Sequence, residues 1–144
     1  MTTSKTIQSE KGFTLLELLV VIVIIGILAL LVIPNLTSAP KKARDIDRKT
    51  DLGAIQKGLE EYYLSYAKYP TLLTELTAMS PPIIKVLPTD TIGTGVYVYT
   101  YTPSGTSAYS LKACLENGSD TGKNTATDAT CAPSNRSYLL SNSN

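Results

Sequence analysis

A run of 21 mostly apolar residues near the N-terminus, Phe13 to Ile33, constrains this chain more than any other feature. A helix of that length rises about 30 Å, which matches the thickness of a bilayer core. The hydrophobic segment of a cleaved secretory signal is shorter, about 7–15 residues. The run therefore predicts a retained membrane helix, and a removed signal or a buried soluble helix are the alternatives.

One carboxylate, Glu17, interrupts this run. A charged side chain at the centre of a membrane helix costs roughly 2.5–3.5 kcal/mol on insertion scales and is a functional residue by default. If the chain were cut between Gly12 and Phe13, a positive amine would appear about one helical turn from Glu17. An unpaired carboxylate and an unpaired amine are both expensive in lipid, and bringing them together relieves both costs.

The composition argues against an enzyme. The chain has no His, which excludes Ser-His-Asp and Cys-His catalysis and His-ligated zinc. Its two cysteines cannot form a four-thiolate metal site. We therefore predict a protein without catalytic activity and without a cofactor.

The formal net charge of +1 gives no general affinity for polyanions. The basic stretch Lys41–Lys49 could contact DNA or anionic lipid, but it is interleaved with Asp45 and Asp47. We interpret it as a solvated helix face that contacts other subunits, and we predict no nucleic-acid partner.

Helical periodicity continues beyond the apolar run. Apolar side chains recur at spacings of mostly three and four residues: Ala43, Ile46, Leu52, Ile55, Leu59, Tyr62 and Tyr66. We predict one long helix from Phe13 to Tyr66 that bends near Pro34, because proline cannot donate a hydrogen bond to the carbonyl of Leu30. Gly26 adds local flexibility. The second half of this helix is amphipathic and needs a partner.

The remainder of the chain predicts a small β-sheet. Leu72, Leu76 and Met79 indicate a short helical segment, and Val96–Thr102 alternates as a strand with three tyrosines on one face. A turn at residues 103–107 and a second strand, Ala108–Glu116, complete a hairpin. Tyr138–Leu140 offers a further strand or anchor. We assign the tyrosines to core packing, and because a lone hairpin is marginal, we expect the amphipathic helix to cover it.

The predicted organisation is therefore α+β. It comprises a leader, residues 1–12, and a hydrophobic membrane or filament-core helix, residues 13–34. An amphipathic helix, residues 35–68, and a globular head, residues 69–144, follow. The lysines and arginines after the apolar run favour a location in the cytoplasm for the part of the chain that follows the membrane helix. The cysteine pair favours a location outside the cytoplasm, where disulfides persist. Composition alone does not decide the orientation.

The segment Lys11–Glu17 (KGFTLLE), the apolar run after it and Pro34 near its end resemble the N-terminal signal of type IV pilins and of type II secretion pseudopilins. The resemblance implies a pilin-like fold. It also implies that a prepilin peptidase cuts between Gly12 and Phe13 on the cytoplasmic side and methylates the Phe13 amine. Thr14 and Glu17 are then the assembly residues, and Glu17 pairs with the Phe13 amine of a neighbouring subunit. A protonated Glu17 near the membrane edge is the alternative.

The resemblance further implies a subunit that lies first in the cytoplasmic membrane, with its N-terminus inside and its head outside. Its partners are other copies of itself, the peptidase and an assembly machine in that membrane. Our first interpretation is the major pilin of a type IV pilus, an extracellular surface filament. A major pseudopilin of a type II secretion or competence system is the alternative, and a solitary membrane-anchored enzyme or binding domain is a third.

Two further features follow from the resemblance. Pilins commonly carry a C-terminal disulfide loop, which implies a bond between Cys114 and Cys131, with two free buried thiols as the alternative. The family also supports local unwinding of the helix between Gly26 and Pro34, for which a simple kink is the alternative.

Major pseudopilins often carry a calcium site beside a Pro-x-Asp-Pro-Trp-Gly block. Residues 87–93 (LPTDTIG) are similar but lack the second proline and the tryptophan. Asn117, Asp120 and Asp128 could supply oxygen ligands to Ca²⁺, but turn chemistry explains them equally well. We therefore predict no metal, with these three residues as the candidate ligands if calcium binds.

Overall fold

The computed structural model describes residues 12–142, apart from the side chains of residues 31–37. The chain divides into two compact units, residues 1–37 and 38–144, and helix α1 (Leu15–Tyr66) contributes to both. The predicted leader lies outside the described residues except for Gly12. Among the side chains that the structure describes, no helix is both long enough and apolar enough to cross a membrane.

The first unit contains the N-terminal part of α1. Every side chain from Phe13 to Leu30 is exposed, including all of the large apolar ones. The predicted apolar segment extends through residues 31–34, whose side chains lie outside the described part. The bend predicted at Pro34 falls there too and stays a prediction.

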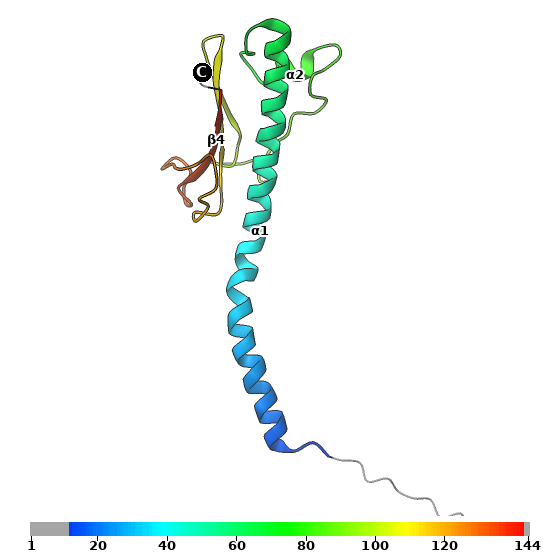
Figure 1. Ribbon diagram of the computed structural model, residues 1–144, viewed down its shortest axis with the longest axis vertical. Coiled ribbons are helices and arrows are strands. Elements are labelled where there is room, and N and C mark those ends of the chain that lie inside the picture. The colour runs from blue at the N-terminus through cyan, green and yellow to red at the C-terminus, as the bar shows by residue number, and fades with distance from the viewer. Residues whose placement is uncertain (1–11, 143–144) are drawn as a thin grey trace, which may run out of the picture. The chain divides into compact units, whose positions relative to one another are not determined.

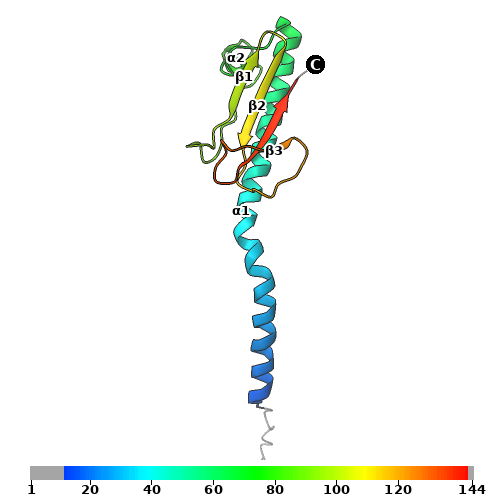
Figure 2. The same ribbon diagram turned by 90° about the vertical axis from the view of Figure 1, so that its left-hand side faces the viewer.

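The second unit is an antiparallel sheet covered by the C-terminal part of α1. The strands are β1 (Thr100–Ser104), β2 (Ala108–Cys114), β3 (Thr125–Thr127) and β4 (Arg136–Ser141). Their order is β1-β2-β4-β3, and every neighbouring pair is antiparallel. Figure 2 shows all four strands in front of α1. The predicted α+β class is confirmed.

The core of this unit lies between α1 and the inward face of the sheet. Leu52, Ile55 and Leu59 of α1 are fully buried, as is Leu111 of β2, and they form one cluster. Tyr62, Tyr69, Leu76, Tyr109, Ala113 and Leu140 complete it. Figure 1 shows the sheet on one side of α1 and the short helix α2 (Glu75–Ala78) on the other. The predicted covering of the hairpin by the helix is therefore present.

The predicted apolar face of α1 is correct in its middle and wrong at its ends. Ile46 is 63% exposed and Tyr66 is 48% exposed, and Ala43 is exposed as well. Two charged residues, Asp45 and Arg48, are buried in the inward positions before Leu52. The interpretation of residues 41–49 as a solvated face is therefore wrong for this pair, because both side chains are ion-paired inside the head.

The strands differ from prediction at their ends. Val96–Tyr99 is outside the sheet, since two glycines at positive φ, Gly93 and Gly95, produce turns before β1 begins at Thr100. Residues 103 and 104, predicted as a turn, extend β1 instead. The strand at Tyr138–Leu140 is confirmed as part of β4, and β3 was not predicted.

Helix α1 ends where the prediction placed its end. The next residue, Ala67, has a left-handed φ of 54°, and its N–H donates to the carbonyl of Tyr63. A left-handed residue with such a bond is a common way for a helix to stop, because it turns the backbone away while satisfying a terminal carbonyl.

Candidate functional site

Thr14 and Glu17 form a reciprocal cap at the start of α1. The Thr14 Oγ1 accepts a hydrogen bond from the Glu17 N–H at 3.2 Å. The Glu17 carboxylate accepts in return from the N–H of Thr14 at 3.0 Å and from its hydroxyl at 2.8 Å. This is the capping box that a Thr-x-x-Glu pattern forms before an apolar helix. One oxygen of Glu17, Oε2, receives both of these bonds, so the carboxylate is held beside residue 14.

Four other residues with predicted roles lie in the N-terminal segment, and their positions in the structure do not test those roles. Gly12 and Phe13 are exposed and precede the helix, and Phe13 is 81% exposed. Gly26 lies inside α1, and a Cβ added there would meet nothing within 4 Å. Pro34 lies within α1, but its side chain is outside the described part. The cleavage, assembly and flexibility roles therefore stay predictions.

The disulfide between Cys114 and Cys131 is present. It joins the end of β2 to the loop that follows β3, with 17 residues of sequence separation. The loop that it closes is tied to α1 by Lys49, whose Nζ lies 2.6 Å from Asp120, and to β2 by Lys112, whose Nζ lies 3.1 Å from Asp128. The bond therefore restrains one edge of the head.

We expect loss of this disulfide to cost about 3 kcal/mol of unfolding free energy, because an open loop of this length has more freedom in the unfolded state. A variant with both Cys114→Ser and Cys131→Ser should show this loss in denaturant unfolding. Adding a reductant should destabilise the wild-type chain by the same amount and leave the double variant unchanged. Equal stability of oxidised and reduced wild type would contradict the expectation.

A buried cluster of charges lies between α1 and the rest of the head. The Arg48 side chain is 1% exposed, and three carboxylates contact its guanidinium. Its Nε and Nη2 bind the two oxygens of Asp90 at 2.5 and 3.2 Å. Its Nη1 binds Asp45 at 2.8 Å and Glu116 at 2.9 Å. The acids come from the helix, from the loop before β1 and from the segment after β2, so one side chain joins three parts of the fold.

Neighbouring groups complete the cluster. Arg44 binds both oxygens of Glu116 at 2.6 Å in the bidentate geometry that makes strong charge-assisted bonds. The Asp45 carboxylate also accepts the backbone N–H groups of Glu116 and Asn117 at 2.9 and 2.8 Å. The guanidinium carbon of Arg48 lies 4.6 Å from the ring centre of Tyr97. Sequence patterns predicted none of these contacts, since residues 44 and 116 are far apart in the chain.

These contacts change the acidity of the cluster. Hydrogen bonds from Arg44, with those from Arg48, lower the pKa of Glu116 from 4.5 to about 2 against the opposing effect of burial. Burial would lower the pKa of Arg48, but its bonds to Asp90, Asp45 and Glu116 outweigh this and raise it. Burial would likewise raise the pKa of Asp90, but the hydrogen bond from Arg48 outweighs this effect, and the pKa is lowered. The ionised forms of Arg48, Asp90 and Glu116 are therefore the stable ones.

Glu116 should make the stability of the head depend on pH. A carboxyl whose pKa falls on folding contributes stability above its unfolded pKa, here about 4.5, and loses it as the pH falls toward about 2. We expect Glu116→Gln to cost ~2 kcal/mol at neutral pH, with the difference from wild type shrinking between those two pH values. Denaturant unfolding across a pH series measures this. Glu61→Gln, at an exposed position, is the control and should follow the wild-type curve.

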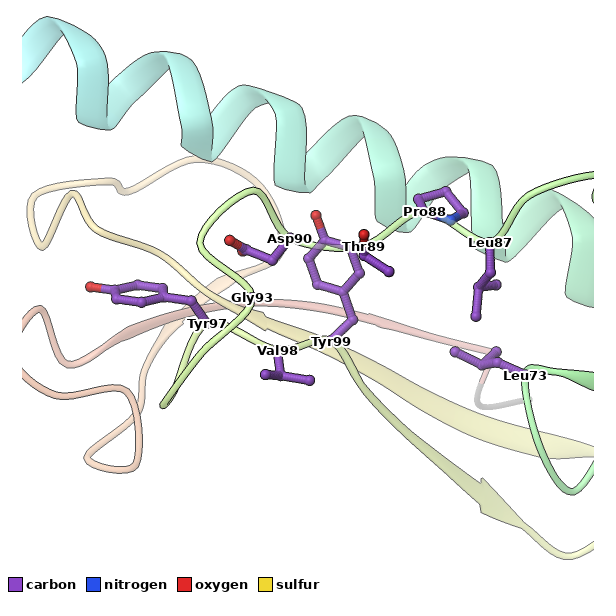
Figure 3. Close-up of a pocket in the computed structure, with 9 residues that line it drawn as sticks. All are labelled: Leu73, Leu87, Pro88, Thr89, Asp90, Gly93, Tyr97, Val98 and Tyr99. Atoms are coloured by element: carbon purple, nitrogen blue, oxygen red, sulfur yellow. The ribbon is translucent and has the colours of Figure 1, made fainter.

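A half-open pocket of about 260 Å³ lies beside this cluster. It is lined by Leu73, Leu87, Pro88, Thr89, Asp90, Gly93, Tyr97, Val98 and Tyr99, and Figure 3 shows them below α1. Its acid, Asp90, is bound to Arg48, and the hydroxyl of Tyr99 donates to Asp51 at 2.7 Å. Two of its polar side chains, Asp90 and Tyr99, are thus engaged with α1, and the rest of the lining is mainly apolar.

The match to a protein-family model lies in the N-terminal segment of the chain. Residues 7–33 match the family model of the prokaryotic N-terminal methylation motif. Over 88 residues the chain is 43% identical to the type II secretion system core protein G of Klebsiella michiganensis, covering 58% of this chain and 62% of that protein. This chain is similar to proteins of the type IV pilin and type II secretion pseudopilin family.

Further relatives give the same result. Core protein G of Vibrio cholerae is 43% identical over 75 residues, which cover 52% of this chain and 51% of that protein. The protein of the same name from Pseudomonas aeruginosa is 42% identical over 72 residues, with coverages of 50% and 51%. The chain spans about half to three fifths of the length of these curated relatives. No solved structure matches it.

These relatives change the order of our functional interpretations. The predicted resemblance to pilins and pseudopilins is confirmed, and the named relatives are secretion-system proteins. They support the alternative, a type II secretion pseudopilin, better than the type IV pilus. The N-terminal motif could not make this distinction, because both branches share it.

Proposed function

We propose that this chain is the major pseudopilin of a type II secretion system, a structural subunit without catalytic activity. The observation that carries the proposal is its similarity, at 42–43% identity, to core protein G of several such systems. The methylation motif at residues 7–33 supports processing before assembly. The subunit is anchored in the cytoplasmic membrane and then enters a short filament outside that membrane.

Processing prepares the N-terminus for assembly. A prepilin peptidase cuts between Gly12 and Phe13 and leaves a positive amine one residue before the helix cap. Exposed apolar side chains from Phe13 to Leu30 pack against those of other copies in the filament core, which removes them from solvent and lipid. In that setting Glu17 of one subunit pairs with the Phe13 amine of the next, since either charge alone is costly there.

The capping geometry supports this pairing. Glu17 Oε2 is held by Thr14, which fixes the carboxylate at the start of α1. These two hydrogen bonds use one oxygen, and a carboxylate can accept about four in total. A neighbour's amine can therefore bind without opening the cap. The pairing sets the register of adjacent subunits, because a shifted subunit leaves buried charge uncompensated.

A type IV pilus is a second candidate because of one observation. The disulfide Cys114–Cys131 closes a C-terminal loop of the kind that the pilin resemblance implied. Such a pilus would form long surface filaments and not a short secretion fibre.

Deletion of the gene in the source organism separates the two functions. If the chain is a pseudopilin, the deletion strain should retain the secreted proteins inside the cell envelope. A plasmid copy of the wild-type gene should restore their release into the culture medium. A copy carrying Gly12→Val should not restore them. Normal protein release together with the loss of long surface filaments in electron micrographs would overturn the proposal in favour of the pilus.

A further inference from the structure

The resemblance to major pseudopilins implies a calcium site in the head, and the described residues can be tested for one. Ca²⁺ needs six to eight oxygen ligands, several of them carboxylates with free lone pairs. The candidates are Asp90, within the segment similar to the family block, and Asn117, Asp120 and Asp128 in the disulfide loop. A fit would require these oxygens to converge with no cation of the protein among them.

Asp90 does not meet that requirement. Both of its oxygens bind the Arg48 guanidinium, and Oδ1 also accepts the N–H of Ile92 at 2.8 Å. The side chains of Arg48 and Asp90 are 1% and 2% exposed. A divalent cation placed on Asp90 would lie within a few ångströms of a buried guanidinium, where like charges repel strongly.

The loop candidates are engaged in the same way. Asp120 pairs with Lys49 and Asp128 with Lys112, and each also accepts backbone N–H bonds within its own turn. The side-chain oxygen of Asn117 accepts the N–H of Ser119 at 3.2 Å. Within the described part of the chain, no three acidic, Cys or His side chains form a group that suits a metal ion. The residues present therefore do not fit calcium.

We propose that the Arg48 guanidinium is a built-in cation that holds the head together in place of a bound divalent metal. It does what a bound ion would do at this point, since it joins carboxylates from α1, from the loop before β1 and from the segment after β2. The head of this subunit is then stable without Ca²⁺.

The chemistry of arginine suits this task. A guanidinium is planar, remains charged at any relevant pH and presents five donors in a fixed fork. Here four of its contacts go to three acids, and the face of Tyr97 lies against it. Arg44 supplies a second cation to Glu116, so two arginines face three carboxylates. Because these cations are covalent parts of the chain, neither dilution nor a chelator can remove them.

Thermal unfolding of the full chain in detergent tests the proposal. Wild type should show the same Tm in excess EDTA and in millimolar CaCl₂, and calorimetric titration with CaCl₂ should give no saturable heat. Arg48→Met keeps much of the side-chain length and removes the charge, so the buried Asp45 and Asp90 lose their cation and Glu116 keeps only Arg44. We expect its Tm to fall by roughly 10 °C or more.

Arg136→Met is the matched control. Its guanidinium donates to the carbonyl of Gly118 and to the hydroxyl of Thr127, both on the surface of the same head. Its Tm should stay within a few degrees of wild type.

Two outcomes would overturn the proposal. One is a rise in wild-type Tm with CaCl₂ that EDTA reverses, and the other is an Arg48→Met variant as stable as wild type. If Arg48→Met does not accumulate as folded protein, the calcium titration of wild type still decides. The readout is stability and not secretion, so its failure is distinct from failure of the proposed function.

Discussion

Filament assembly should be lost when Glu17 is replaced by Gln, while cleavage of the subunit continues. Gln has almost the shape of Glu, and its amide oxygen can still accept from the N–H and hydroxyl of Thr14, so the helix cap is kept. What disappears is the negative charge. The positive Phe13 amine of the neighbouring subunit then has no counter-ion in an apolar filament core, which costs several kcal/mol for each subunit. Electron microscopy of sheared or overproduced filaments measures the yield.

The Gln substitution separates the two roles proposed for one carboxylate. Glu17→Ala would remove the cap and the charge together, and its effect could not be assigned. Glu61→Gln, at an exposed position in the second unit, changes the same chemistry and should leave filaments unaffected. A normal filament yield from Glu17→Gln would show that Glu17 serves the helix cap and not a charge pair between subunits.

Replacing Gly12 with Val should leave the subunit uncut and prevent assembly entirely. The peptide bond before Phe13 then stays intact, so residue 13 offers a neutral amide N–H and no amine for Glu17 to pair with. Uncut subunit should accumulate in the membrane fraction, where its larger mass is visible on a denaturing gel. No filaments should form.

The same substitution elsewhere in the chain controls for its bulk. Gly53 lies in α1, and a Cβ there would meet nothing within 4 Å, so Gly53→Val should be cut and assembled normally apart from a small helix-propensity effect. Filaments built from uncut Gly12→Val subunits would contradict the view that cleavage creates the missing charge.

The long helix and the sheet class could be predicted because both depend on local patterns. Apolar spacing located α1 to within two residues of its observed start, Leu15, and at its observed end, Tyr66. Alternation located the hairpin but not its limits, since the φ > 0 turns at Gly93 and Gly95 delay β1 to Thr100. Strand β3 is only three residues long and carries no pattern of its own.

Some residues of the candidate site could likewise be predicted from a local pattern, and others could not. The proposed cleavage and assembly residues come from a compact motif, and the Thr-x-x-Glu pattern within it is also the signal of the capping box. The buried cluster had no such signal, because Asp45 and Arg48 on a helix are usually solvated and their partners lie far along the chain. Only the fold brings Asp90 and Glu116 to them.

The most direct test of the account is the intact mass of the wild-type subunit purified from membranes. We expect a mature chain that begins at Phe13, lacks residues 1–12 and carries one added methyl group. Its mass should also be lower by two hydrogens than that of its reduced form, because of the Cys114–Cys131 bond. A stable, secretion-competent subunit that still contains residues 1–12 would contradict the account.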